Sequence, residues 1–171
     1  MLKLCGCITV LTGAGGLGYV LARQMKQHLM ELLAFQEMLY LLTGEMKHYR
    51  KTLEEAFRAV AEHSERYGVI LMEIAERLKS CETETGSGIW RKSFVKNREK
   101  LLLDEDELEL VLRTGHFLDA PDMEAKCREL KLYEDQMEEK IGRRRAELAE
   151  RRKICMYGSM LGGIFIIIVL L

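Results

Sequence analysis

Uncharged, mostly apolar residues fill both ends of the chain, and a charged interval separates them. The first apolar segment covers residues 4–22 and the last covers residues 154–171. A helix rises ~1.5 Å per residue, so a helix over either segment is about 27 to 29 Å long, close to the ~30 Å hydrocarbon core of a bilayer. The pattern therefore predicts transmembrane helices at 4–22 and 154–171, with a helical domain at 23–153 between them.

The charged interval begins with a helical pattern of apolar side chains. They recur at alternating steps of three and four, which is typical of one buried face of a helix. The residues are Leu32, Phe35, Leu39, Leu42, Met46, Tyr49 and Leu53. We expect one helix that continues directly from the first apolar segment. Exposed members of this stripe, such as Phe35, Leu39 or Leu42, would form a groove for a partner.

A second apolar stripe begins at Leu53, and Gly68 interrupts it, which predicts two helices with a break near the glycine. The stretch 82–88 lacks periodicity and is rich in turn-forming residues, so we expect the main loop there. A helix then starts near Ile89 and carries Trp90 inward. The interval is rich in helix-forming residues. Together these features predict an all-α, antiparallel helical bundle.

Capping signals mark the last helices of the interval. Asp104 followed by Glu107 is typical of a helix start, because the Asp104 carboxylate can accept from backbone N–H groups that lack a partner in the first turn, and the helix dipole favours the second acid. Gly115 is expected to end that helix, and the segment 119–122, which holds the chain's one proline, to begin the next. The final helix leads into the second apolar segment without a strong breaker.

Small residues four apart let two membrane helices approach closely, and both apolar segments show this spacing. The residues concerned are Gly13, Ala14, Gly18, Ala22, Gly158 and Gly162. We interpret them as packing positions, either between the two spans or against neighbouring subunits.

The glycines of the first segment also permit a second interpretation. Residues 13–18 match G-x-G-x-x-G, and Glu37 follows about twenty residues later, as in a dinucleotide-binding fingerprint. That fingerprint needs a βαβ unit, and no apolar run of strand length follows Arg23 to supply the second strand. A membrane dinucleotide-binding redox protein is therefore an alternative that lacks a predicted fold.

Basic residues flank the second apolar segment on its interior side. They are Arg143, Arg144, Arg145, Arg151, Arg152 and Lys153. Because Lys and Arg stay on the cytoplasmic side of a span, this run predicts a cytoplasmic interval with both termini outside. Cleavage of the first segment as a signal peptide after Ala22 is the competing interpretation, but it would export the interval against the basic run.

Composition narrows the function. All 27 Asp and Glu residues, and every Lys and Arg except Lys3, lie between Arg23 and Lys153. This near balance argues against a nucleic-acid partner, which needs a net basic face. Glu45 and His48 form half of a di-iron motif, and the second half is missing. The sequence predicts no catalytic residue, no metal, no cofactor and no small-molecule substrate.

Order and spacing along the whole chain resemble the stage III sporulation protein AB family. The matching features, after a glycine-rich first span, are Glu45-Met46 with Tyr49, Thr52-Leu53, Glu55-Ala56-Phe57, Trp90, Gly115 with Leu118 and Asp122, Lys153, Gly158 and Gly162-Gly163. The chain departs from the family in reading Leu118-Asp119 where relatives read Leu-Gly. It also lacks a proline in the segment 52–57, which would let the helices around Leu53 run on continuously.

The resemblance implies an endospore-forming bacterium and a non-enzymatic subunit of the channel that joins mother cell and forespore. Members are similar to the membrane platform proteins of type II secretion and type IV pilus machines. The implied partners are the mother-cell membrane, a cytoplasmic ATPase, other channel subunits and further copies of the chain. The alternative function is that of a membrane-anchored coiled-coil tether without a motor partner. The radius of gyration of such a tether would exceed the roughly 14 Å of a globular domain.

Overall fold

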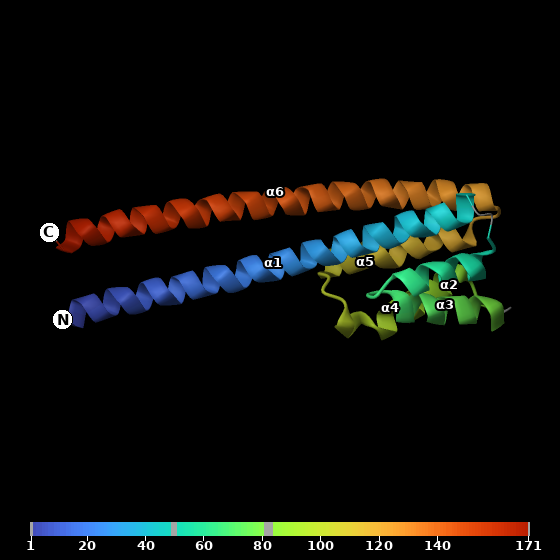
Figure 1. Cartoon of the computed structure of the whole chain (residues 1–171), viewed down its shortest axis with the longest axis horizontal. Helices are drawn as coiled ribbons and strands as arrows, with labels where there is room; N and C mark the ends of the chain where they lie inside the picture. Colours follow the sequence, from blue (N-terminus) through green and yellow to red (C-terminus); the bar gives the residue numbers. More distant parts are fainter. Residues whose placement is uncertain (1, 49–50, 81–83, 171) are drawn as a thin grey trace. The chain divides into compact units, whose positions relative to one another are not determined.

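The computed structural model describes the backbone of residues 2–48, 51–80 and 84–170, and the side chains of 23–48, 51–80, 84–151 and 153–154. Every regular element in this part of the chain is helical, which confirms the all-α class (Figure 1). The elements are α1 (Leu2–His48), α2 (Leu53–His63), α3 (Gly68–Ser80), α4 (Gly86–Lys96), η1 (Arg98–Lys100), α5 (Glu105–Thr114), η2 (Gly115–Asp119) and α6 (Met123–Leu170).

The chain divides into two compact units. Unit 1 consists of Met1–Leu29 and Gly142–Leu171, and unit 2 consists of Met30–Ile141. Unit 2 therefore contains the C-terminal part of α1, the N-terminal part of α6 and every element between them. The buried core of the described residues belongs to unit 2.

Six aromatic rings form the centre of unit 2. They belong to Phe35, Phe57, Tyr67, Trp90, Phe94 and Phe117, and all are fully buried. The centroids of Trp90 and Phe94, one turn apart on α4, are 4.6 Å apart. Phe35 on α1 meets Trp90 edge-on at a centroid distance of 6.3 Å. Because the rings come from α1, α2, α4, η2 and the turn before α3, their burial holds these elements around one core.

Trp90 and Gly115 fit together at the end of α5. The indole Nε1 of Trp90 donates a 2.8 Å hydrogen bond to the carbonyl of Val111. A Cβ atom added to Gly115 would lie 2.5 Å from Cδ1 of Trp90, so the ring occupies the space of the missing side chain. The expectations that Trp90 faces inward and that Gly115 ends its helix are confirmed.

The first apolar stripe belongs to the core, but it does not follow one helix. Its described members in α1, all at most 1% exposed, are Leu32, Phe35, Leu39, Leu42 and Met46. α1 ends at His48, Leu53 opens α2, and Tyr49 lies outside the described residues. The expected continuation of this helix from the first apolar segment is confirmed, because α1 runs from Leu2 to His48. The continuous helix expected around Leu53 is wrong, because the N–H of Thr52 donates to the Glu55 carboxylate while the Glu55 N–H donates to the Thr52 hydroxyl. This capping box starts a new helix without a proline.

Gly68 begins α3, which confirms the predicted break. A Cβ atom added to Gly68 would lie 2.7 Å from the backbone oxygen of Ala61. α2 and α3 can therefore approach this closely only where the residue has no side chain.

The loop before α4 is shorter than the predicted stretch 82–88. α4 begins at Gly86, because the hydroxyl of Thr85 accepts a 3.2 Å hydrogen bond from the N–H of Gly88 and caps the helix. Residues 81–83 lie outside the described part of the chain.

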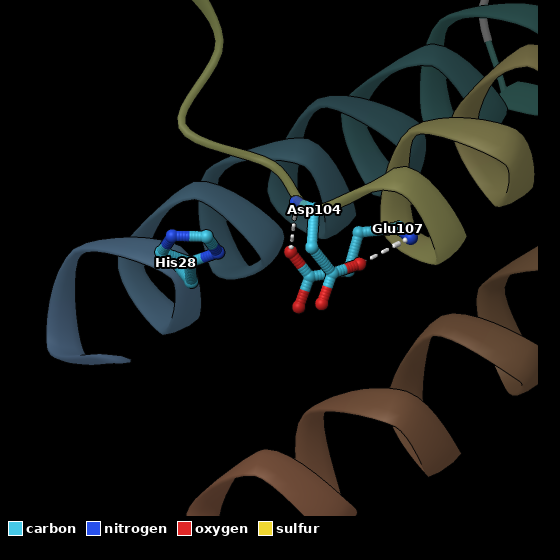
Figure 2. Close-up of side chains that lie close together, drawn as sticks. All are labelled: His28, Asp104 and Glu107. Atoms are coloured by element: carbon cyan, nitrogen blue, oxygen red, sulfur yellow. Dashed lines mark hydrogen bonds between the residues drawn. The ribbon is translucent and has the colours of Figure 1, made fainter. Parts of the chain in front are cut away.

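Figure 2 shows the capping box at the start of α5. The N–H of Glu107 donates to Oδ1 of Asp104 at 2.8 Å, and the N–H of Asp104 donates to Oε2 of Glu107 at 2.9 Å. The predicted helix start is confirmed. The Glu107 side chain is fully buried, whereas Glu105 and Asp106 are exposed. His28, also labelled in the figure, belongs to unit 1.

Apart from Ile154, the expected membrane spans lie outside the side chains that the structure describes. The backbone is helical over residues 4–22, within α1, and over residues 154–170, within α6. Where side chains are described, no helix has an apolar stretch long enough to cross a bilayer. The positions expected to pack the spans also lie outside that part: Gly13, Ala14, Gly18, Ala22, Gly158 and Gly162.

Candidate interaction surface

Among the described residues of unit 2, the first stripe does not form the expected partner groove. Phe35, Leu39 and Leu42 are each 0% exposed, so none of them can contact a partner on this surface. The expectation is wrong because the stripe of α1 is the face that the other helices of unit 2 cover. Apolar side chains that stay exposed are the better guide to an interaction surface.

Val69 is the most exposed large apolar side chain among the described residues, at 72%. It lines a groove of about 600 Å³, here called the α3 groove. The lining residues are Ala61, Gly68, Val69, Met72, Glu73, Glu76 and Lys96. The groove thus lies where the last turns of α2, the first turns of α3 and the end of α4 meet, and much of its lining is apolar.

Charged groups form the rim of the α3 groove. Lys96 Nζ lies 3.2 Å from both carboxylate oxygens of Glu73, which also pairs with Arg77 at 3.0 Å. Glu76 is exposed beside them. The lining therefore has two carboxylates and one lysine. A partner segment with a small apolar side chain and a neighbouring basic residue has the matching chemistry.

A smaller groove of about 190 Å³ lies between α1 and the turn that joins α2 to α3. Its lining residues are Ala34, Glu37, Met38, Leu41, His63, Ser64, Glu65 and Arg66. Leu41 is 42% exposed, and the carboxylates of Glu37 and Glu65 are on the surface. Val69 in the α3 groove is 72% exposed, against 42% for Leu41 here, so the α3 groove is the stronger candidate for a partner protein.

Glu31 fastens the α2–α3 turn to α1. Tyr67 Oη donates a 2.7 Å hydrogen bond to Oε1 of Glu31, and Arg66 Nε lies 3.0 Å from Oε2. The Arg66 contact is an ion pair without the alignment of a hydrogen bond. Burial, reinforced by the Glu31 carboxylate, raises the pKa of Tyr67 far above its ordinary value of 10. Tyr67 is therefore a permanent hydrogen-bond donor at physiological pH.

A second buried carboxylate joins α1 to α6. The hydroxyl of Thr43 donates a 2.7 Å hydrogen bond to Oε1 of Glu134, whose side chain is 2% exposed. Lys131 Nζ lies 3.4 Å from Glu134 Oε2 and 2.9 Å from Asp135 Oδ1. Buried charges need such partners, so this cluster fixes α6 against the end of α1.

The basic residues expected to set topology belong to unit 1. Arg143, Arg145, Arg151 and Lys153 are exposed. Arg144 is half-buried and lies 3.1 Å from Glu147, and the side chain of Arg152 lies outside the described part. Their sequence position beside the last apolar segment is what gives them a topological role, which stays a prediction.

The half di-iron motif and the G-x-G-x-x-G fingerprint are the weaker candidates for a chemical site. Glu45 pairs with Lys51 at 2.5 Å, and His48 is exposed at the end of α1. The described residues include no strand, so they lack the βαβ unit that the G-x-G-x-x-G fingerprint requires.

Comparisons with known proteins point to one family. A family model described as "Stage III sporulation protein AB (spore_III_AB)" matches residues 3–171. A solved structure titled "Stage III sporulation protein AB (SpoIIIAB)" is similar with a TM-score of 0.63 over 72% of this chain and 97% of that chain. The two sequences are 16% identical, so this likeness shows the shared fold. The curated proteins contain no match.

Proposed function

We propose that this chain, which belongs to the stage III sporulation protein AB family, is a non-enzymatic platform subunit of the channel between mother cell and forespore. Its role in sporulation follows from family membership. The family match carries the proposal, because residues 3–171 include the helical body and both apolar end segments. The solved structure supports the same fold for the body.

In this proposal the two apolar segments, 4–22 and 154–171, hold the body against the cytoplasmic face of the mother-cell membrane. Their length matches the ~30 Å core of a bilayer, and the basic run before residue 154 favours a cytoplasmic body with both termini outside. The long helices α1 and α6 then couple movement of unit 2 to the membrane segments. Further copies of the chain and other channel subunits would contact the spans through their small residues.

The partner on the cytoplasmic side is an ATPase, and the α3 groove is its docking site. Val69 exposes apolar surface that water does not favour, and a groove of about 600 Å³ can take the side chains of a partner segment. The exposed carboxylate of Glu76 on the rim favours a partner segment with a basic residue, whereas Glu73 already pairs with Lys96 and Arg77. The chain itself performs no bond chemistry and transmits or anchors force.

Capture of the ATPase encoded beside this chain tests the docking site. Full-length protein in detergent should retain the ATPase, and Val69→Glu should weaken retention at least tenfold, because it places a charge in the apolar groove. Leu132→Glu is the matched control, since Leu132 on α6 is 57% exposed and is absent from the lining of the groove. Equal retention by wild type and the Val69 variant would exclude this groove, and no retention by wild type would exclude the ATPase as a direct partner.

A further inference from the structure

Net charge changes sign along the chain at the border between the two units. Residues 30–103 hold 12 acidic and 12 basic residues, and residues 104–139 hold 13 acidic and 4 basic residues. Residues 142–153 reverse this balance, with 6 basic and 2 acidic residues. The segment 23–29 of α1 adds Arg23 and Lys26 without an acidic residue. Unit 1 is therefore basic and unit 2 is acidic.

One face of α6 changes from buried apolar side chains to arginines near the border between the two units. Leu130, Met137 and Ile141 are buried in unit 2. Steps of three, four and three residues from Ile141 lead to Arg144, Leu148 and Arg151, which continue the same helical face into unit 1. A topology signal needs basic residues near a span, on any face. On this face Arg144 already pairs with Glu147 at 3.1 Å, whereas Arg151 is exposed.

We propose that the basic residues of unit 1 bind the anionic headgroups of membrane lipids. This inference rests on the proposed membrane anchorage, because the uncharged segment 154–171 follows Lys153 directly and would place the basic run at headgroup depth. The exposed members of the run are Arg143, Arg145, Arg151 and Lys153. Guanidinium groups pair with phosphate through two parallel hydrogen bonds, which suits a phospholipid headgroup.

The acidic residues 104–139 would be repelled by the same anionic lipid that attracts the basic run. Residues 104–139 carry a net charge of about minus nine, and an anionic membrane surface repels such a segment. α6 begins at Met123, and its residues 123–139 hold 6 acidic and 3 basic residues. Attraction at residues 142–153 and repulsion of this segment therefore act on the same helix. Anionic lipid would therefore orient α6 with its basic end at the bilayer and its acidic end in water.

Spin-labelled lipids test the inference on the full-length chain in phosphatidylcholine vesicles. We expect the protein to immobilise labelled phosphatidylglycerol at least about fivefold more strongly than labelled phosphatidylcholine, and strong salt to remove the preference. Replacing four basic residues in R143Q/R145Q/R151Q/K153Q should reduce the ratio to near one. The control R91Q/K92Q/R98Q/K100Q removes the same charge from exposed residues of unit 2 and should keep the wild-type ratio.

Four results would overturn the inference. They are no preference in the wild type, an equal loss in the control, a basic-run variant that keeps the preference, and a basic-run variant that instead loses salt-sensitive self-association. The last result would mean that the run binds the acidic segment of a second copy. Alkaline carbonate extraction separates these from failure of the proposed function. A chain that stays in the membrane without selecting lipid defeats this inference alone, whereas a chain that is extracted defeats the anchorage.

Discussion

The Tyr67 hydroxyl donates a 2.7 Å hydrogen bond to Oε1 of Glu31, and both side chains are fully buried. Tyr67→Phe would leave that oxygen without its donor inside unit 2, which costs about 1 to 3 kcal/mol. Chemical unfolding of the full-length protein in detergent, followed by far-UV circular dichroism, measures the loss. Tyr40→Phe is the matched control, because Tyr40 is 45% exposed. Equal stability of the two variants would show that the Glu31 contact contributes nothing.

The same contact predicts how stability depends on pH. Burial and the nearby Glu31 carboxylate raise the pKa of Tyr67 in the folded state above its ordinary value of 10. A raised folded pKa means that the contribution of Tyr67 is complete below pH ~10 and is lost as the pH rises further. The free energy of unfolding of the wild type should therefore fall more steeply above pH ~10 than that of Tyr67→Phe. Parallel curves for the two proteins would contradict this assignment.

Gly115 is expected to be intolerant of a side chain. Gly115→Ala would place a Cβ atom 2.5 Å from Trp90 Cδ1, and the Trp90 ring is held by Phe35, Phe94 and its hydrogen bond to Val111. Such overpacking costs about 1 to 3 kcal/mol or more. Because Trp90 is the chain's one tryptophan, its fluorescence emission should shift in this variant.

The matched control for Gly115 is Gly44→Ala. An added Cβ atom at Gly44 meets no atom within 4 Å, so alanine there should stabilise α1 by about 0.5 to 1 kcal/mol and leave the Trp90 emission unchanged. A Gly115 variant as stable as the Gly44 variant would mean that the packing around Trp90 is wrong.

The capping box of α5 predicts that two alanine variants on the same helical turn differ in stability. Asp104→Ala removes the acceptor of the Glu107 N–H and should cost about 1 kcal/mol. Asp106 is the control on the same turn, because its side chain is 86% exposed and its nearest cation, Lys140, lies 3.9 Å away. Asp106→Ala should change stability by less than about 0.5 kcal/mol. The comparison fails if the two alanine variants unfold at the same denaturant concentration.

Local signals account for the parts of the fold that the sequence predicts correctly. The Asp104–Glu107 box, the break at Gly68 and the helix end at Gly115 each depend on residues within a few positions of one another. The Thr52–Glu55 box is equally local, but the apolar stripe keeps its phase from Met46 to Leu53 and so conceals the end of α1.

The candidate site could not be predicted in the same way, because exposure depends on which helices cover a face. Val69 precedes Ile70 and Leu71, both buried, and the phase of α3 against α2 and α4 is what leaves Val69 outside. Glu31 interrupts an apolar stretch without a local partner. Its role becomes visible when the fold brings Tyr67 and Arg66 to it from 36 and 35 positions away.

The most direct test of the platform asks on which side of the membrane the helical body lies. A full-length variant with its five cysteines replaced by serine and a single new cysteine at the exposed Ser80 of α3, S80C, would be expressed in a bacterium. A membrane-impermeant thiol reagent should label it after the cells are permeabilised and not before, and the chain should stay with the membranes in alkaline carbonate. Labelling in intact cells, or release of the chain by carbonate, would contradict the account.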